Sequence, residues 1–129
     1  MPGTESDRHL ARSMSSAIST AVVALLGEYT GRGPTKARTH INEDLIIVVL
    51  YDMLTAEERD IVRSGGVDLV LATRKAFQKA MKPELIAIVE RFSGRSTSTS
   101  MSHTHFDPDI VVESFFLAPR GNGAPVEKP

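Results

Sequence analysis

The stretch Leu45-Ile-Ile-Val-Val-Leu-Tyr51 decides the fold of this chain, because it is apolar at every position and largely β-branched. Such a run predicts a β-strand, and a strand that is apolar on both faces belongs in the middle of a sheet. The stretch Ile110-Val-Val-Glu-Ser-Phe-Phe-Leu117 is also a strong strand signal, apolar at all positions except Glu113 and Ser114. The two stretches therefore predict two central strands.

A polar strand is expected before each of these apolar strands. In the first, residues 36–41, the side chains alternate, so that Lys36, Arg38 and His40 share one face. The second, residues 96–105, reads STSTSMSHTH and on its composition alone suits a flexible linker. Because a turn and a strong strand follow it, we expect an edge strand instead.

Three helices are predicted between and before these strands. An apolar stripe with steps of three and four residues runs from Leu10 to Tyr29. Thr55-Ala-Glu-Glu58 is a capping box that opens a short helix. A second long stripe runs from Val67 to Phe92 and keeps its phase across Pro83, which allows either one kinked helix or two nearly collinear ones.

The expected fold is therefore α+β, in the order α-β-β-α-α-β-β, with a four-stranded antiparallel sheet in the order 1-2-4-3. Two long helices cover one face of this two-layer domain. The domain is expected to span residues 1–118, and residues 119–129 a disordered tail, because that segment is rich in proline and glycine. Because the helices cover one face of strands that are apolar on both, we expect a homodimer. Either Phe115 or Phe116 faces the second copy, and the sequence leaves that choice open.

Composition narrows the functional classes. The chain has 129 residues, a formal net charge of −1 and no cysteine. Without cysteine, disulfide scaffolds, thiolate metal sites and cysteine nucleophiles are excluded. The near-neutral charge lacks the signature of a nucleic-acid-binding protein. No apolar run approaches the roughly 20 residues of a membrane span, and the N-terminus lacks a signal-peptide profile, so we expect a cytoplasmic protein with no direct membrane insertion.

One cluster of basic residues is a candidate anion site. Gly31-Arg32-Gly33-Pro34 looks like a phosphate loop, but it follows a predicted helix instead of preceding one, and the C-terminal end of a helix repels anions. The motif is therefore interpreted as a helix C-cap. The alternative is a site for a carboxylate or phosphate built from basic and imidazole side chains: Arg32, Lys36, Arg38, His40 and His103.

The sequence contains little evidence for a metal site or a catalytic site. His103 and His105 share one face of the predicted edge strand, but a zinc site needs three or four ligands and the chain offers only two further histidines. No G-x-S-x-G nucleophile elbow is present. We expect no metal, no cofactor and no catalytic residue.

Three co-linear runs carry a family resemblance: GEYTGRGPTKARTHINEDLIIVVLYDMLTAEER, then KPELIAIVERFSGR, then SHTHFDPDIVVESFFL. They resemble the MpsC-like family of small bacterial proteins over about residues 10 to 118. The most specific pieces are the GRGP step, the LTxxE segment, PEL in the long helix and the Ser102-His103 step. Members commonly carry an aspartate two positions beyond that histidine, where this chain has His105, so no ligand chemistry is carried over from that position.

The family label names a sodium-translocating, membrane-potential-generating system, and the resemblance implies an accessory protein of an ion-translocating or inorganic-carbon-uptake system. We therefore carry two hypotheses. The first is a non-catalytic, homodimeric accessory or regulatory protein that binds a membrane-complex partner. The second is a small-ligand or anion-binding domain, with possible enzymatic activity, that uses the basic strand face.

Overall fold

The computed structural model describes residues 4–119. Three helices and four strands follow one another in the predicted order. Their bounds are α1 (Glu5–Thr30), β1 (Lys36–Asn42), β2 (Leu45–Tyr51), α2 (Ala56–Arg63), α3 (Val67–Ser93), β3 (Thr97–Phe106) and β4 (Asp109–Leu117).

The four strands form one antiparallel sheet in the order β1-β2-β4-β3, which confirms the predicted topology. The two apolar strands are neighbours in the middle, and the two polar strands are the edges. The segment predicted over residues 96–105 is therefore a strand and not a linker, and β4 pairs with it along most of Thr97–Phe106. A register shift interrupts that pairing only between Thr97 and Thr99.

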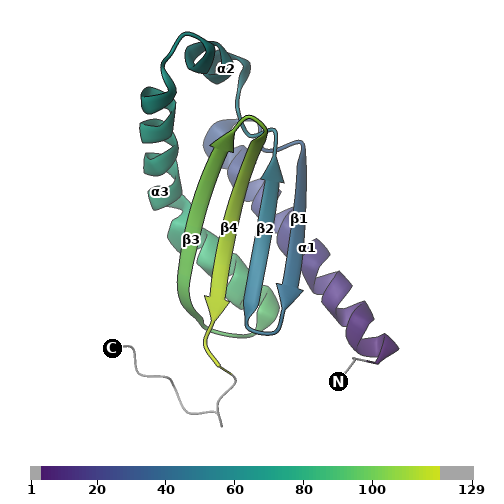
Figure 1. Ribbon diagram of the computed structural model, residues 1–129. Helices are drawn as coiled ribbons and strands as arrows, with labels where there is room; N and C mark the ends of the chain where they lie inside the picture. Colours follow the sequence, from purple (N-terminus) through teal and green to yellow (C-terminus); the bar gives the residue numbers. More distant parts are fainter. Residues whose placement is uncertain (1–3, 120–129) are drawn as a thin grey trace.

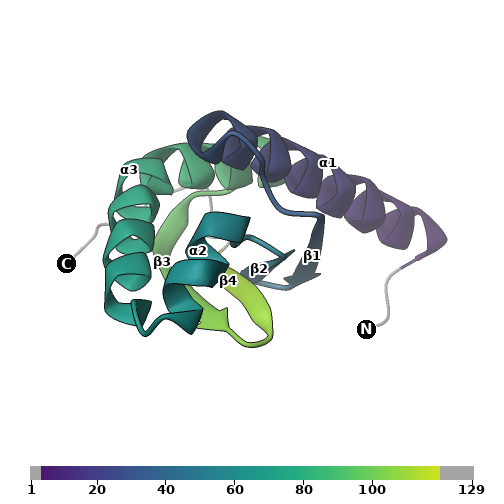
Figure 2. The ribbon, with the colours of Figure 1, turned by 90° about the horizontal axis from the view of Figure 1, so that it is seen from above.

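The two long helices lie on the same face of the sheet, as expected. In Figure 1, α1 and the C-terminal half of α3 pass behind the strands, and Figure 2 shows these two segments above the sheet, with the N-terminal half of α3 beside the β3 edge. Alternate side chains of β2 and β4 point into this inner face and are buried against apolar side chains of α1 and α3. The buried core of the sheet consists of Ile46, Val48, Leu50, Val111, Phe115 and Leu117.

The chain passes from α1 to β1 through the glycine-rich step. Gly31 has φ 79° and donates its backbone N–H to the Gly27 carbonyl at 2.8 Å. A glycine in the left-handed conformation at this position is a common C-cap of an α-helix. Gly33 has φ 75° and packs against α1, where a Cβ atom would lie 3.4 Å from the Val23 carbonyl oxygen. The GRGP motif therefore ends a helix and redirects the chain, as its position predicts.

α3 is a single helix with Pro83 inside it, which resolves the two alternatives for this segment. It runs past the β3 edge and then bends behind the sheet (Figure 1). Proline removes one helical hydrogen bond and bends a helix, so Pro83 accounts for a change of direction within a continuous helix. α2 carries the predicted capping box between Thr55 and Glu58.

The structure also resolves which phenylalanine of β4 faces the helices. Phe115 is 2% exposed within the core, whereas Phe116 is 36% exposed on the opposite face. The predicted tail, apart from Pro119, lies outside the described residues.

This difference gives a stability prediction. Truncating a buried Phe to Ala typically costs about 3 to 5 kcal/mol of unfolding free energy. We expect Phe115→Ala to fall in that range and Phe116→Ala to cost about 1 kcal/mol or less, because its ring is already partly in solvent. Urea unfolding of the two variants measures both. Equal losses would contradict the assignment of the two faces.

Candidate functional site: the open face of the sheet

The face of the sheet opposite the helices lies outside the hydrophobic core. We call it the outer face, and no helix of the described residues crosses it (Figure 1). Along its middle lie apolar side chains of β2 and β4, interrupted only by Ser114. These apolar residues are Leu45, Ile47, Val49, Tyr51, Ile110, Val112 and Phe116. Contiguous apolar surface of this kind marks an interaction site on soluble proteins.

One edge of the outer face is cationic, and the other carries imidazole groups. Lys36, Arg38 and His40 project from β1, and the register places Arg38 beside Val49. On the other edge the register places His103 beside Val112 and His105 beside Ile110. No aspartate or glutamate occupies an outer-face position of the four strands.

Only three of the five residues of the candidate anion site lie together. Lys36, Arg38 and His40 form one row on β1, and the Lys36 ammonium lies 5.5 Å from the centre of the Tyr51 ring. His103 lies in the same cross-strand row as Arg38 but at the far edge, with β2 and β4 between them. At about 4.8 Å per strand spacing, that separation is roughly 14 Å.

Arg32 serves the loop and not the outer face. Its guanidinium Nη1 donates to the backbone carbonyls of Asp52 at 3.0 Å and Leu54 at 2.7 Å. These bonds tie the α1–β1 connection to the chain that leaves β2. A single subunit therefore presents a basic row on β1, without Arg32 and without His103.

The histidines of β3 stay separate from any third ligand. His105 Nδ1 lies 2.8 Å from the Pro108 carbonyl oxygen. Among residues 4–119, no three His, Asp or Glu side chains come close enough to hold a metal ion.

A second polar feature lies inside the domain, beneath α3. Glu113 of β4 points into the inner face, is 4% exposed, and accepts a hydrogen bond from the Ser102 hydroxyl of β3. Nearby, Gln78 of α3 donates from Nε2 to the Thr104 hydroxyl at 2.9 Å. Burial raises the pKa of Glu113 from 4.5 to about 7, against the opposing effects of the Ser102 hydrogen bond and the positive charge of Lys82.

Sequence analysis missed Glu113 and a second buried charge, Arg74. Arg74 is 6% exposed, and its guanidinium Nη2 donates to the Met53 carbonyl at 2.6 Å and to Glu58 Oε1 at 2.5 Å. The capping glutamate of α2 is thereby also an anchor for α3. The signal was present in the periodicity, because Arg74 falls on the apolar stripe of its helix and Glu113 shares a strand face with Val111 and Phe115.

Residues 11–119 match the family described as "Na+-translocating membrane potential-generating system (MpsC)". The chain belongs to the MpsC family. It matches no curated protein and no solved structure. The family description names a membrane system, and this MpsC-family chain has surfaces other than the outer face that lie away from the core.

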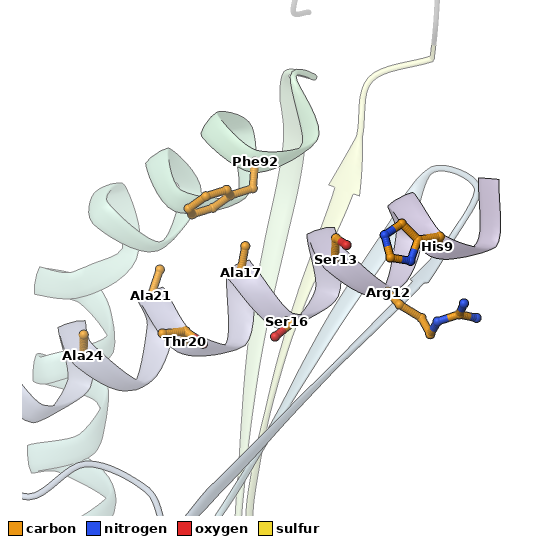
Figure 3. A pocket seen from close by; sticks show the side chains of 9 residues that line it. All are labelled: His9, Arg12, Ser13, Ser16, Ala17, Thr20, Ala21, Ala24 and Phe92. Carbon is orange, nitrogen blue, oxygen red and sulfur yellow. The ribbon is translucent and has the colours of Figure 1, made fainter. Parts of the chain in front are cut away.

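One such surface lies on the side of α1 that faces away from the sheet. A shallow hollow there is lined mainly by small α1 side chains and by Phe92 of α3 (Figure 3). Ala17 and Ala21 point toward the Phe92 side of the hollow, and His9 and Ser13 lie near its open end. These side chains provide no carboxylate to orient the histidine, so they do not form a nucleophilic triad.

The same helix is apolar enough to be compared with a membrane span. Within the described residues, Arg8–Thr30 is long and apolar enough to cross a bilayer by length and composition alone. However, Ile18, Val22 and Leu26 of this helix are at most 1% exposed, in the core against the sheet. A core helix meets the same criterion of length and composition.

The raised pKa of Glu113 predicts a pH-dependent stability. Because the folded protein holds this proton more tightly than the unfolded chain, the stabilisation is complete below about pH 4.5 and is lost as the pH rises through about 7. At about 1.4 kcal/mol per pKa unit, the loss is on the order of 3 kcal/mol.

We therefore expect Glu113→Gln to gain stability relative to the parent protein at pH 8 and to match it closely at pH 5. Chemical denaturation across this pH range tests the expectation, with Glu57→Gln on the exposed surface of α2 as the matched control. A parent protein whose stability is flat between pH 5 and pH 8 would contradict it.

Proposed function

We propose that this protein is a non-catalytic accessory or regulatory subunit of the membrane system for which its family is named. The observation that carries the proposal is the outer face, an uncovered apolar sheet surface between a cationic edge strand and an edge strand with two histidines. A monomeric protein rarely leaves a contiguous apolar surface of this kind in water, so a protein surface is its natural occupant. The family description supports the membrane system as the setting.

The proposal places the protein in the cytoplasm, at the periphery of a membrane complex. α1 offers little for insertion, because one side of it packs on the sheet. Its Ser19 hydroxyl lies 2.7 Å from the Thr39 hydroxyl of β1. Its Tyr29 hydroxyl donates to Glu84 of α3, and that hydrogen bond raises the pKa of Tyr29. Inserting α1 into a bilayer would separate these contacts and expose the core.

In isolation, we propose, two copies pack their outer faces together as a homodimer. A two-fold axis parallel to the strands is the favourable arrangement, because it places β1 of one copy opposite β3 of the other. Val49 then lies opposite Val112, and Leu45 opposite Phe116, in the rows that the register defines. An axis perpendicular to the strands would instead place the basic row of β1 on its own copy.

The homodimer predicts a specific response to charge on the outer face. Phe116→Glu, which buries a carboxylate in the contact, should convert the dimer to a monomer at micromolar concentration. Leu69→Glu is the matched control, because Leu69 is 61% exposed on α3, away from the outer face. Light scattering coupled to size-exclusion chromatography measures both. A parent protein of 14.0 kDa at every concentration would contradict the homodimer.

A second candidate function is the binding of a small anion by the basic row of β1. The observation in its favour is that Lys36, Arg38 and His40 share a face on which no carboxylate competes with a ligand. Such a row is able to hold a phosphate or a carboxylate without a loop motif. This function requires only one subunit, without Arg32 and His103.

Thermal melting against phosphate, nucleotides and carboxylates tests this candidate. A ligand present at 100 times its Kd adds about 2.7 kcal/mol to the stability of the folded protein. Arg38→Glu should abolish that shift and leave the melting temperature of the free protein nearly unchanged, because Arg38 is exposed. A panel without any shift favours the accessory function, and an unfolded variant would assign these side chains a structural role.

A further inference from the structure

The charge pattern of the outer face specifies more than an apolar contact. The chain has 15 Lys and Arg against 16 Asp and Glu, yet the outer-face positions of the four strands include no acidic side chain. Their ionisable groups, the Tyr51 phenol aside, are Lys36, Arg38, His40, His103 and His105. The outer face therefore has a positive potential on a chain whose formal net charge is −1.

A second copy does not complement this pattern. In the strand-parallel arrangement, Arg38 of one copy lies opposite His103 of the other and Lys36 opposite His105, so that no cation gains an acidic partner. Burying the Lys36 and Arg38 charges in such a contact without a counter-charge is unfavourable. We therefore expect the outer face to bind a second copy less tightly than a partner with acidic groups opposite its basic side chains. Such a partner would displace the second copy.

The dimensions of the outer face indicate the shape of such a partner. The two edge strands lie about three strand spacings apart, roughly 14 Å, and an α-helix with its side chains is about 10 to 12 Å wide. A helix lying along β2 and β4 therefore covers the apolar band and brings its flanks over β1 and β3. The strands of seven residues are roughly 20 Å long, which matches about 14 residues of helix.

From this complementarity we propose that the outer face binds an amphipathic helix of a partner protein, with an apolar stripe flanked on both sides by Asp or Glu. The apolar stripe packs on Ile47, Val49 and Val112. The acidic flanks lie over Lys36 and Arg38 on one side and His103 on the other. Neither α1 nor α2 of a second copy fits, because α1 has arginines near its exposed N-terminal end and α2 has only eight residues.

A protein helix fits the outer face better than an anionic lipid surface. Membrane-surface binding by an apolar face requires burial about 5 to 10 Å into the headgroup and acyl boundary. The central side chains here are mostly short, β-branched and half-buried among their neighbours, so they do not project to that depth. The two long cationic side chains, moreover, lie on one edge only.

The inference deepens the proposed accessory function by naming the chemistry of the partner, and two labelled peptides test it. Peptide E is an 18-residue amphipathic helix with a Leu and Ile stripe flanked by Glu, and peptide K is identical except for Lys in place of each Glu. Fluorescence anisotropy at low ionic strength and pH 7.5 measures the binding of each peptide to the full chain. We expect peptide E to bind at least tenfold more tightly than peptide K and to lose affinity as salt is added.

A charge swap makes the test specific to the outer face. The double variant Lys36→Glu/Arg38→Glu should weaken the binding of peptide E and strengthen that of peptide K, whereas Leu69→Glu should change neither. Equal affinities of the parent protein for the two peptides, or a preference that the double variant does not reduce, would overturn the inference. Circular dichroism of the double variant verifies that the exposed substitutions leave the fold intact.

Two further measurements separate the alternatives. Sedimentation without peptide measures whether the protein is a homodimer. A monomeric protein that still prefers peptide E would contradict the homodimer and support the helix-binding site. Cosedimentation with vesicles of phosphatidylglycerol, and with phosphatidylcholine as control, reports the lipid alternative. Tight binding to the anionic vesicles, abolished by the double variant, together with equal affinities for the two peptides, would assign the outer face to lipid instead.

Discussion

The packing of two long helices against one face of a four-stranded sheet is the constraint on which the rest of this structure depends. β2 and β4 are apolar on both faces, but α1 and α3 bury only the face that contains residues such as Val48 and Phe115. A helix layer on one side stabilises the sheet and leaves the other side facing solvent. The open apolar face therefore follows directly from a fold with one helical layer and two double-sided strands.

Two ionisable side chains, Arg74 and Glu113, are buried between the helices and the sheet. Arg74 is buried and paired, since it donates hydrogen bonds to both the Met53 carbonyl and Glu58. Glu113 is buried with a single hydroxyl partner, Ser102, and burial accordingly raises its pKa to about 7. The first arrangement fastens α2 to α3 and to the end of β2. The second makes the packing of β3 and β4 beneath α3 sensitive to protonation near neutral pH.

The two edges of the sheet give the outer face its character. Each apolar strand pairs with a polar edge strand, so the apolar band is bordered on both sides by basic or imidazole groups and nowhere by acids. The description of the MpsC family, to which the chain belongs, names a membrane-potential-generating system. An apolar band beside the cationic side chains of β1 is suited to binding an acidic, amphipathic protein segment.

The sequence by itself determined the elements, their order and the sheet topology. The double-sided stretches 45–51 and 110–117, the capping box at Thr55 and the glycine at position 31 are local signals, and local propensity and periodicity suffice to interpret them. The same signals predicted the uncovered face, because two helices cannot cover both sides of a sheet.

Only the tertiary structure decided where individual side chains go. From the sequence, Arg32 and His103 are grouped with the basic side chains of β1 as one candidate anion site. The strand order instead separates His103 from β1 by two strands, and the Arg32 guanidinium donates to backbone carbonyls. The choice between Phe115 and Phe116 needed the register, since a shift of one residue exchanges the faces of a strand. The environment of Glu113 depends on Ser102 and Lys82, which come from β3 and α3, and contacts between distant segments exist only once the chain has folded.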